Sequence, residues 1–386
     1  MFMKKVVALF VSVIMLLSLA ACASEENPQQ TAQFTVPLDD ASYVYQAAAD
    51  AAPLPGGSAI ALAADSNGLE SGAESLLWKG IQTFASNFGY TAQSFTYGDG
   101  EADSAEEALR NAAQSGATLV VCRGEKMAEA LFQVQANFPG VHYLLFDGEP
   151  HNEDYTVYTT ESNVHCVQFQ EEQAGYLAGY AAVTEGFTAL GFAGNEELPD
   201  VVRYCTGFLQ GAEDAAEQQG EEVSMRVWYT GNIDDPALVT SRLVDWYNNG
   251  TGLILANGGD LVQRAMDAAN QTGGKIFATD WDQNALGERV LGSAVKCYNT
   301  AVQRQLYDFF SSNSTWSQEA AGQTEKLGYT DGSVALAGST WRFNTFTQRE
   351  YERLYEELRN SDRKVETYSD MDTLPDTPSV TLEIEN

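Results

Sequence analysis

The sequence has few residues that could bind a transition metal or form a thiol redox centre. It contains three His and five Cys among 386 residues, and no two Cys have the CxxC spacing. A zinc ribbon needs clustered Cys and His ligands, and a thioredoxin-like centre needs a CxxC motif. We therefore exclude both classes and expect no metal. Four Cys lie among apolar residues and are either buried free thiols or include one disulfide: Cys122, Cys166, Cys205 and Cys297.

Basic residues are also scarce. Lys and Arg number 21 against 54 Asp and Glu, which gives a formal net charge of −33 at pH 7. A polyanion of this kind is repelled by phosphate backbones. We therefore expect no nucleic-acid partner.

The catalytic and phosphate-binding motifs of common enzyme classes are missing. There is no GxSxG motif, no GxxxxGK[ST] motif and no Gly-rich turn after the apolar run that ends at Ala64. The residues after that run, DSNGLE at 65–70, are acidic and would repel a phosphate. The sequence thus predicts a protein that is not an enzyme and holds no nucleotide or other cofactor.

The N-terminus has the pattern of a secretory signal peptide. Lys4 and Lys5 precede an apolar stretch from Val6 to Leu17, and small residues then lead to Cys22. The ending LAAC resembles the bacterial lipobox, in which the Cys is diacylated and becomes the mature N-terminus. We expect residues 1–21 to be removed and the lipid on Cys22 to hold the protein at the extracytoplasmic face of the cell membrane. A transmembrane anchor is the alternative, although the stretch is short for one.

The rest of the chain alternates between apolar runs and amphipathic helical windows. Its length and its 44% hydrophobic content suit two ordered domains. The expected strands are 58–64, 90–97, 119–122, 141–146, 189–193, 223–229, 252–256 and 275–279. The expected helices are 74–87, one opened by the capping box Ser104-x-x-Glu107, 126–137, 169–182, 201–217, one starting at Asp235-Pro236, and 261–270. Two such blocks predict an α/β fold with two lobes, each a parallel sheet flanked by helices, and a ligand cleft between them.

The pattern also predicts where the lobes begin and end. Residues 22–57 are expected to be a flexible tether that starts at the lipidated Cys22. The first lobe would comprise 58–165 and about 284–330, and the second 166–283 and about 331–364. Residues 365–386 would be a loosely ordered acidic tail. The chain would cross between the lobes near 164–169, 283–291 and 330.

Polar residues follow several of the predicted strands. Asp65, Arg123, Asp147, Asn257-Gly258 and Asp280 come at these ends. In open α/β sheets, ligands bind beyond the carboxyl ends of the strands. We therefore expect these side chains to surround one pocket, whereas the alternative for any single Asp is a turn or a helix cap.

Several short segments resemble one known family. They are Asp65 with Gly72-Ala73-Glu74 and Trp78-Lys79-Gly80, the run from Phe138 to Asp147, QEEQAGYLAGYAA at 170–182, GFAGNEELPDVVRYCTGFLQG at 191–211, Thr279–Gln283 and Ser293–Lys296. Their order and spacing resemble the basic membrane protein family, the substrate-binding lipoproteins of ABC importers that capture purine nucleosides. The resemblance covers residues 58–353 and implies a type I periplasmic-binding-protein fold.

The resemblance also implies a set of ligand contacts. By position in the motifs, these are Asp65, Glu74, Asp147, Asp280 and Lys296, to which we add Asn257 and Gly258 at a strand end and Trp281 as a possible stacking ring. Ala73 and Ile233 stand where the family has aromatic residues that stack on the base. We therefore expect purine nucleosides to bind more weakly than about 10 μM. The ligand would be a hydroxyl-rich or amine-bearing solute, or a nucleoside held by a ring at another position.

These features together predict capture of a small solute, nucleoside-like or a polyol, by closure of two lobes. The partners would be that solute, an ABC permease and, through Cys22, the membrane, and the protein would be a monomer. The alternative is a receptor lipoprotein that senses the same ligand and signals to a membrane partner without transport.

Overall fold

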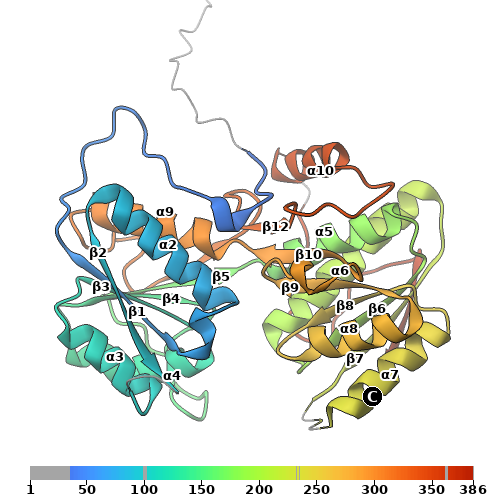
Figure 1. Cartoon of the computed structure of the whole chain (residues 1–386), viewed down its shortest axis with the longest axis horizontal. Helices are drawn as coiled ribbons and strands as arrows, with labels where there is room; N and C mark the ends of the chain where they lie inside the picture. The colour runs from blue at the N-terminus through green and yellow to red at the C-terminus, as the bar shows by residue number, and fades with distance from the viewer. Residues whose placement is uncertain (1–34, 99–101, 232, 234, 361–363, 386) are drawn as a thin grey trace, which may run out of the picture. The chain divides into compact units, whose positions relative to one another are not determined.

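Two β-sheets, each with helices on both faces, organise the chain in the computed structural model (Figure 1). The structure describes residues 35–98, 102–231, 233, 235–360 and 364–385. The predicted signal peptide and Cys22 lie outside this range. From Val36 onward the chain folds as one unit. None of the helices in the described part of the chain is long and apolar enough to span a bilayer.

The first sheet contains six strands of the described chain, all parallel, in the order β11-β5-β4-β3-β1-β2. Their bounds are β1 Ala59–Asp65, β2 Thr91–Tyr97, β3 Leu119–Arg123, β4 His142–Phe146, β5 Val164–Phe169 and β11 Thr324–Leu327. Four helices flank it: α2 Ala73–Phe88, α3 Ala105–Gln114, α4 Glu125–Val134 and α9 Tyr298–Ser311. Figure 1 shows α2 and α9 on one face and α3 and α4 on the other. We call this sheet and its helices the first lobe.

The second sheet contains seven described strands in the order β12-β10-β9-β8-β6-β7-β13, parallel except for β12. Their bounds are β6 Ala189–Gly194, β7 Val223–Tyr229, β8 Leu253–Asn257, β9 Lys275–Asp280, β10 Val290–Lys296, β12 Val334–Leu336 and β13 Val380–Glu385. The helices of this second lobe are α5 Glu171–Thr184, α6 Pro199–Gln219, α7 Pro236–Asn248, α8 Leu261–Thr272 and α10 Gln348–Asn360.

The predicted α/β fold is confirmed, and each predicted strand agrees with an observed one to within one residue at either end. The helix start signals also act as expected. The Ser104 hydroxyl accepts a hydrogen bond from the Glu107 amide at 3.1 Å, and Asp235 caps α7 by accepting from the Ala237 amide at 3.0 Å. These signals are local, so they could be recognised without knowledge of the tertiary structure.

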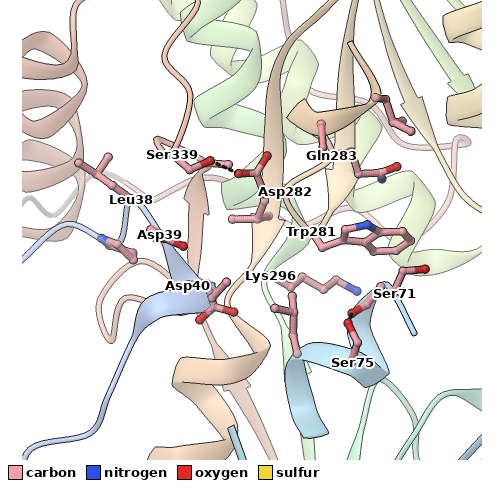
Figure 2. Close-up of a pocket in the computed structure, with 18 residues that line it drawn as sticks. Leu38, Asp39, Asp40, Ser71, Ser75, Trp281, Asp282, Gln283, Lys296 and Ser339 are labelled. Atoms are coloured by element: carbon pink, nitrogen blue, oxygen red, sulfur yellow. Dashed lines mark hydrogen bonds between the residues drawn. The ribbon is translucent and has the colours of Figure 1, made fainter. Parts of the chain in front are cut away.

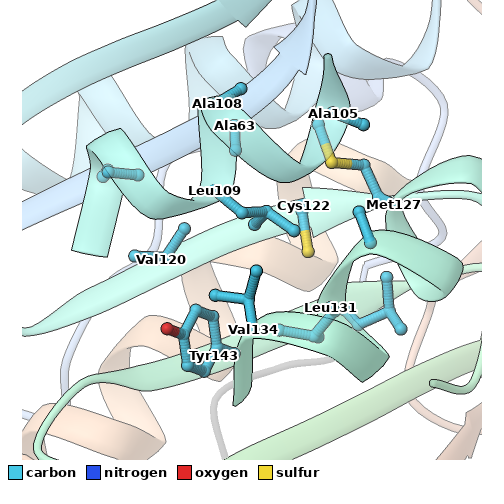
Figure 3. Packing of buried hydrophobic residues seen from close by; sticks show 14 of the residues in the cluster. Ala63, Ala105, Ala108, Leu109, Val120, Cys122, Met127, Leu131, Val134 and Tyr143 are labelled. Carbon is cyan, nitrogen blue, oxygen red and sulfur yellow. The ribbon is translucent and has the colours of Figure 1, made fainter. Parts of the chain in front are cut away.

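The core of the first lobe lies between its sheet and helices α3 and α4. Leu109 of α3 and Leu131 of α4 meet Cys122 and Tyr143 of the neighbouring strands β3 and β4 (Figure 3). All four side chains are buried. The predicted apolar run of a central parallel strand reflects this burial on both faces. All four Cys singled out in the sequence are buried free thiols.

Helices α5 and α6 approach closely because glycines face the opposite backbone. A Cβ added at Gly179 would lie 2.0 Å from the Phe208 carbonyl oxygen, and one added at Gly207 would lie 2.0 Å from that of Glu172. Only glycine fits such contacts. This packing fixes the N-terminal end of α5, where Glu171 enters the site described below.

The lobe boundaries differ from those predicted. Strand β5 belongs to the first sheet through Phe169, and β10 belongs to the second sheet although it was expected in the first lobe. The chain therefore crosses after Phe169, at Lys296–Tyr298, and between β11 and β12. The second crossing was misplaced because β10 reads VLGSAVK, in which Gly292 and Ser293 interrupt the apolar run that marks the other central strands.

Two predicted loose segments are ordered. The last strand, β13, pairs in parallel with β7, so at least residues 380–385 of the expected tail form the edge of the second sheet. Residues 36–45 of the expected tether, here called the strap, bind to both lobes. The carboxylate of Asp40 accepts from the amides of Asn299 and Thr300 at 2.9 and 2.8 Å at the start of α9, and the Leu38 carbonyl accepts from the Gly338 amide at 2.7 Å.

Candidate functional site

A cavity of about 880 Å³ lies at the carboxyl ends of the strands and is lined by residues of both lobes. We call it the cleft cavity. Arg123 and Asp147 enter it from the ends of β3 and β4, and Asn257, Asp280 and Lys296 from the ends of β8, β9 and β10. Its position agrees with the general location of ligand sites in parallel sheets. Its volume is within the range of small-molecule pockets.

A buried cluster of charges forms the floor of this cavity. The Nζ atom of Lys296 lies 2.9 Å from Glu171 Oε1, 3.3 Å from Asp147 Oδ1 and 3.6 Å from Asp280 Oδ1. The Lys296 and Glu171 side chains are each only 3% exposed. Burial would lower the pKa of Lys296, but Asp147 and Glu171 raise it well above its ordinary value. Lys296 is therefore a permanent cation shared by three carboxylates.

Arg123 extends the cluster within the first lobe. Its Nε donates to Asp147 Oδ2 at 2.7 Å, and its Nη1 lies 3.0 Å from Glu74 Oε1. The Tyr298 hydroxyl donates to the same Asp147 oxygen at 2.6 Å. Both oxygens of Asp147 are thus occupied by protein groups. Lys296 and Tyr298 lie where the chain crosses between the lobes. The network therefore connects this crossing to the floor of the cleft cavity.

Asp147 and Asp280 occupy equivalent positions at the ends of β4 and β9. Both have left-handed backbone conformations, with φ of 51° and 68°. Few residues other than glycine adopt this conformation, although Asp tolerates it better than most and it often marks functional sites. In each lobe the chain therefore turns sharply after the strand and presents a carboxylate to the cavity.

The two carboxylates titrate differently. Burial disfavours the charge of Asp147, but Lys296 and Arg123 outweigh it and lower the pKa to about 2. Burial raises the pKa of Asp280 above its ordinary value, and Lys296 offsets this only in part. Among the described residues, Asp280 has only long contacts, with Lys296 at 3.6 Å, the Tyr204 hydroxyl at 3.5 Å and the Thr279 hydroxyl at 3.4 Å. It therefore has acceptor capacity left for a hydroxyl or amine of a ligand.

The cleft cavity as a whole is electronegative. Eight carboxylates and three cations are among its lining residues. Each cation is already paired with protein carboxylates: Arg123 and Lys296 as above, and Arg203 with Glu171 at 2.7 Å. Such a site repels anions and suits neutral hydroxyl donors or amines. This agrees with the acidic segment that the sequence places after β1.

Seven of the eight residues predicted to contact ligand line the cleft cavity. They are Glu74, Asp147, Asn257, Gly258, Asp280, Trp281 and Lys296. Asp65 is not among the lining residues. It accepts from the amide and the side chain of Asn67 at 3.0 and 3.2 Å. This is the turn-forming alternative considered for such residues.

The two positions at which the family has stacking aromatic residues, Ala73 and Ile233, have different surroundings. Ala73 lines the cleft cavity, whereas Ile233 packs against the core of the second lobe. Trp281 lies close to Gly72, where an added Cβ would be 3.7 Å from the indole ring.

Three residues of the charge cluster, Glu171, Arg203 and Tyr298, were not predicted from the sequence. The one available signal was the pair of adjacent Glu residues at the start of a helix that is otherwise almost fully apolar.

A second cavity, of about 610 Å³, lies under the strap and shares Trp281, Gly72 and Lys296 with the cleft cavity. Figure 2 shows Asp39 and Asp40 on one side of it and Trp281 on the other. Trp281 is therefore positioned between the two cavities.

Within the described residues, no group of three or more His, Cys, Asp or Glu side chains is arranged to hold a metal ion.

Comparison with solved structures supports the architecture. A solute-binding protein of an ABC transporter from Conexibacter woesei superposes with a TM-score of 0.61 at 18% identity, covering 81% of this chain and 99% of that one. A similar protein from Aeropyrum pernix gives 0.56 at 18% identity, covering 78% and 86%. A transcriptional activator of the comK gene from Bacillus halodurans gives 0.59 at 17% identity, covering 82% and 99%. At these identities the likeness shows the type I periplasmic-binding-protein-like fold alone.

Comparison of sequences identifies the family. Basic membrane protein B of Borreliella burgdorferi is 23% identical over 234 residues, which is 59% of this chain and 65% of that protein, slightly under two thirds of its length. The family model Bmp, described as "ABC transporter substrate-binding protein PnrA-like", matches residues 58–367. This match covers both lobes except the last strand, β13, and includes every residue of the charge cluster. The chain therefore belongs to the Bmp family of PnrA-like ABC transporter substrate-binding proteins.

Proposed function

We propose that this protein captures a small polar solute, a nucleoside or a related hydroxyl-rich compound, and delivers it to an ABC permease. The observation that carries the proposal is the cleft cavity with its Lys296 cluster, to which both lobes contribute. A charge network of this kind keeps polar groups oriented for a ligand before it arrives, so less ordering is needed on binding.

In the proposed mechanism the solute enters between the lobes and the lobes close around it. Asp280 would accept hydrogen bonds from hydroxyl groups of the solute, whereas Asp147, whose oxygens are occupied by Lys296, Arg123 and Tyr298, would hold the cavity floor in place. Lys296 would limit the repulsion between these carboxylates. Three chain crossings allow closure but restrict twisting. The closed form would dock on the permease.

Calorimetric titration of the purified full-length protein would test this function. The panel is adenosine, guanosine, inosine, the free bases, ribose and other polyols. We expect saturable binding of at least one hydroxyl-bearing solute. Absence of binding to the whole panel by folded protein would contradict the proposed ligand class.

Uptake of the bound solute by cells with and without the gene would separate transport from sensing. Loss of uptake in the deletion strain is expected for an importer. Normal uptake together with tight binding would favour the receptor alternative.

The lipid anchor is the second part of the proposal. It is supported by the lipobox-like ending at Cys22, which lies outside the described residues. We expect Cys22→Ser to release the protein from the membrane fraction into the medium. Unchanged membrane retention would contradict lipidation and favour a spanning anchor.

A further inference from the structure

The strap is attached to the first lobe along helix α9. The Asn299 side chain donates to the carbonyls of Asp40 and Tyr43 at 2.6 and 3.1 Å. The Gln303 side chain donates to the Tyr43 carbonyl and accepts from the Tyr45 amide, both at 3.0 Å. Asn299 and Gln303 are completely buried, so water does not compete for these hydrogen bonds. From Asp40 onward the strap therefore moves with the first lobe.

The other end of the strap reaches the second lobe. Besides the hydrogen bond from the Gly338 amide to the Leu38 carbonyl, the two residues are in close side-chain contact. A Cβ added at Gly338 would lie 2.6 Å from Leu38 Cδ2 and 2.9 Å from Leu38 Cβ. Gly338 follows β12, the edge strand of the second sheet, and the preceding Ala337 amide still donates to the Ser293 carbonyl of β10 at 2.9 Å. The strap is therefore a noncovalent link between the lobes, in addition to the three chain crossings.

This link lies beside the cleft cavity without forming part of it. Ser339, next to Gly338, donates to the Asp282 carboxylate (Figure 2). Asp282 in turn follows Trp281, which lines the cleft cavity, whereas neither Leu38 nor Gly338 is among the lining residues. A change at the link can therefore affect the position of the second lobe without removing a group that touches the solute.

The arrangement of the lobes that the strap spans is one in which a single solute can reach both. Trp281 of the second lobe lies against Gly72 of the first. Asp147 of the first lobe and Asp280 of the second share Lys296. A protein that binds its ligand between two lobes must adopt such an arrangement, and the ligand-free protein adopts it for only a fraction of the time unless other contacts favour it.

We propose that the contact between Leu38 and Gly338 is a latch that holds the two lobes in the arrangement that binds solute. The inference rests on the proposed function and adds a control of its affinity. A latch raises the fraction of ligand-free protein in which the lobes are already positioned, and the apparent affinity rises by the same factor. The strap thus contributes to how tightly the solute is held although it does not contact the solute.

The test compares Gly338→Ala and Leu38→Ala with Val44→Ala in the full-length protein. The methyl group added at Gly338 collides with Leu38 and displaces the end of the strap, whereas Leu38→Ala removes the apolar contact from the other side. Val44 is a matched control, because it is an aliphatic residue of the same strap that is 41% exposed and lines neither cavity. Small-angle X-ray scattering measures the radius of gyration of each ligand-free protein. Calorimetry measures its affinity for adenosine, guanosine, inosine and ribose.

We expect both latch variants to have a larger radius of gyration than the wild type without ligand. At saturation with the panel solute that binds most tightly, they should return to the wild-type value. Their affinity for that solute should fall about 3- to 20-fold, as expected for loss of one hydrogen bond and its apolar contact. The double variant should bind little more weakly than either single variant, because both changes break the same contact. Val44→Ala should behave as the wild type in both measurements.

Three outcomes would overturn the inference and leave the proposed function intact. In the first, the radius of gyration or the affinity is unchanged in both latch variants. In the second, the variants bind more tightly, which would mean that the strap holds the lobes apart. In the third, the losses add in the double variant, so the two changes act separately and not through one contact. A folded wild type that binds no solute of the panel would instead contradict the proposed ligand class, and the scattering comparison would still decide whether the latch holds the lobes together.

Discussion

The two lobes present the same residue at the same position, but Asp147 and Asp280 have different environments. One oxygen of Asp147 is paired with Lys296, and the other accepts hydrogen bonds from Arg123 and Tyr298. The pKa of Asp147 is lowered to about 2. Asp280 has only long contacts, and burial raises its pKa. In the second lobe no described Arg pairs with the strand-end carboxylate, whereas Arg123 does so in the first.

A shared position at a strand end therefore does not give these two carboxylates a shared role. A carboxylate whose acceptor sites are filled by protein cations contributes mainly to the network that joins the lobes. A carboxylate held near a single, more distant cation costs free energy when it is charged in the empty protein, and a ligand donor can relieve that cost. We therefore expect Asp147 to act mainly in stability and Asp280 mainly in affinity.

The largest expected effect is on stability, in Asp147→Ala. Removal of this carboxylate leaves Arg123 and Lys296 with fewer partners in a buried site. Breaking a buried ion pair costs about 3–5 kcal/mol, and because Lys296 keeps Glu171 and Asp280 we expect about 3 kcal/mol. Urea denaturation of the ligand-free protein measures this. Asp245→Ala, at an exposed carboxylate on α7, serves as a comparison for general effects of charge removal. An unchanged free energy of unfolding in Asp147→Ala would contradict the stabilising role that distinguishes Asp147 from Asp280.

Asp280→Ala should show the opposite pattern. A charge-assisted hydrogen bond contributes about 1.5–3 kcal/mol, so we expect binding of the best solute in the panel to weaken about 10- to 100-fold. The Tm of the ligand-free protein should change little, because Asp280 makes only long contacts. Calorimetry and thermal denaturation on the same sample give both values. A large fall in Tm with unchanged affinity would identify Asp280 as structural.

Titration of Asp147 should contribute to the pH dependence of the free energy of unfolding. Its pKa in the folded protein lies below its ordinary value of 3.8, so the charged form stabilises the fold above pH 4. This stabilisation should be lost as the pH falls from about 4 to 2, and the difference corresponds to about 2 kcal/mol. Burial raises the pKa of Asp280, so its contribution to the stability of the fold decreases as the pH rises above the ordinary pKa of an Asp side chain, 3.8. Denaturation between pH 2 and 5 should give a shallower slope for Asp147→Asn than for the wild type. An equal slope would mean that other carboxylates dominate.

The smallest effect is expected for Asp65→Ala. The family resemblance implied a ligand contact for this residue, but the structure places it in a turn outside the cleft cavity. We expect less than a threefold change in affinity, well under 1 kcal/mol. A loss comparable to that of Asp280→Ala would show that the loop after β1 moves into the cleft when the lobes close.

Most of the fold could be predicted from the sequence. Apolar runs such as LVVC at 119–122 identify central strands, because a parallel strand is buried on both faces. Caps such as Asp235-Pro236 identify helix starts through contacts within two residues. Strands β5 and β10 and the edge strands β11, β12 and β13 were not recognised. Strand β5 carries the polar residues His165 and Gln168. Strand β10 is interrupted by small residues, and edge strands are short or polar, so their pairing depends on a neighbour that is distant in sequence.

The candidate site could be predicted only in part, and the division has a physical cause. The polar residues that end the strands could be identified from the sequence, and parallel connectivity brings those ends to one edge. It also determined the acidic character of the site. Three features follow from packing: Glu171 and Tyr298 join the Lys296 cluster, Asp147 is saturated while Asp280 is not, and Tyr155 and Tyr158 line the cleft cavity. Those outcomes depend on the close packing of α5 on α6 and on where the chain crosses between lobes, which are contacts between residues far apart in the chain that no local pattern encodes.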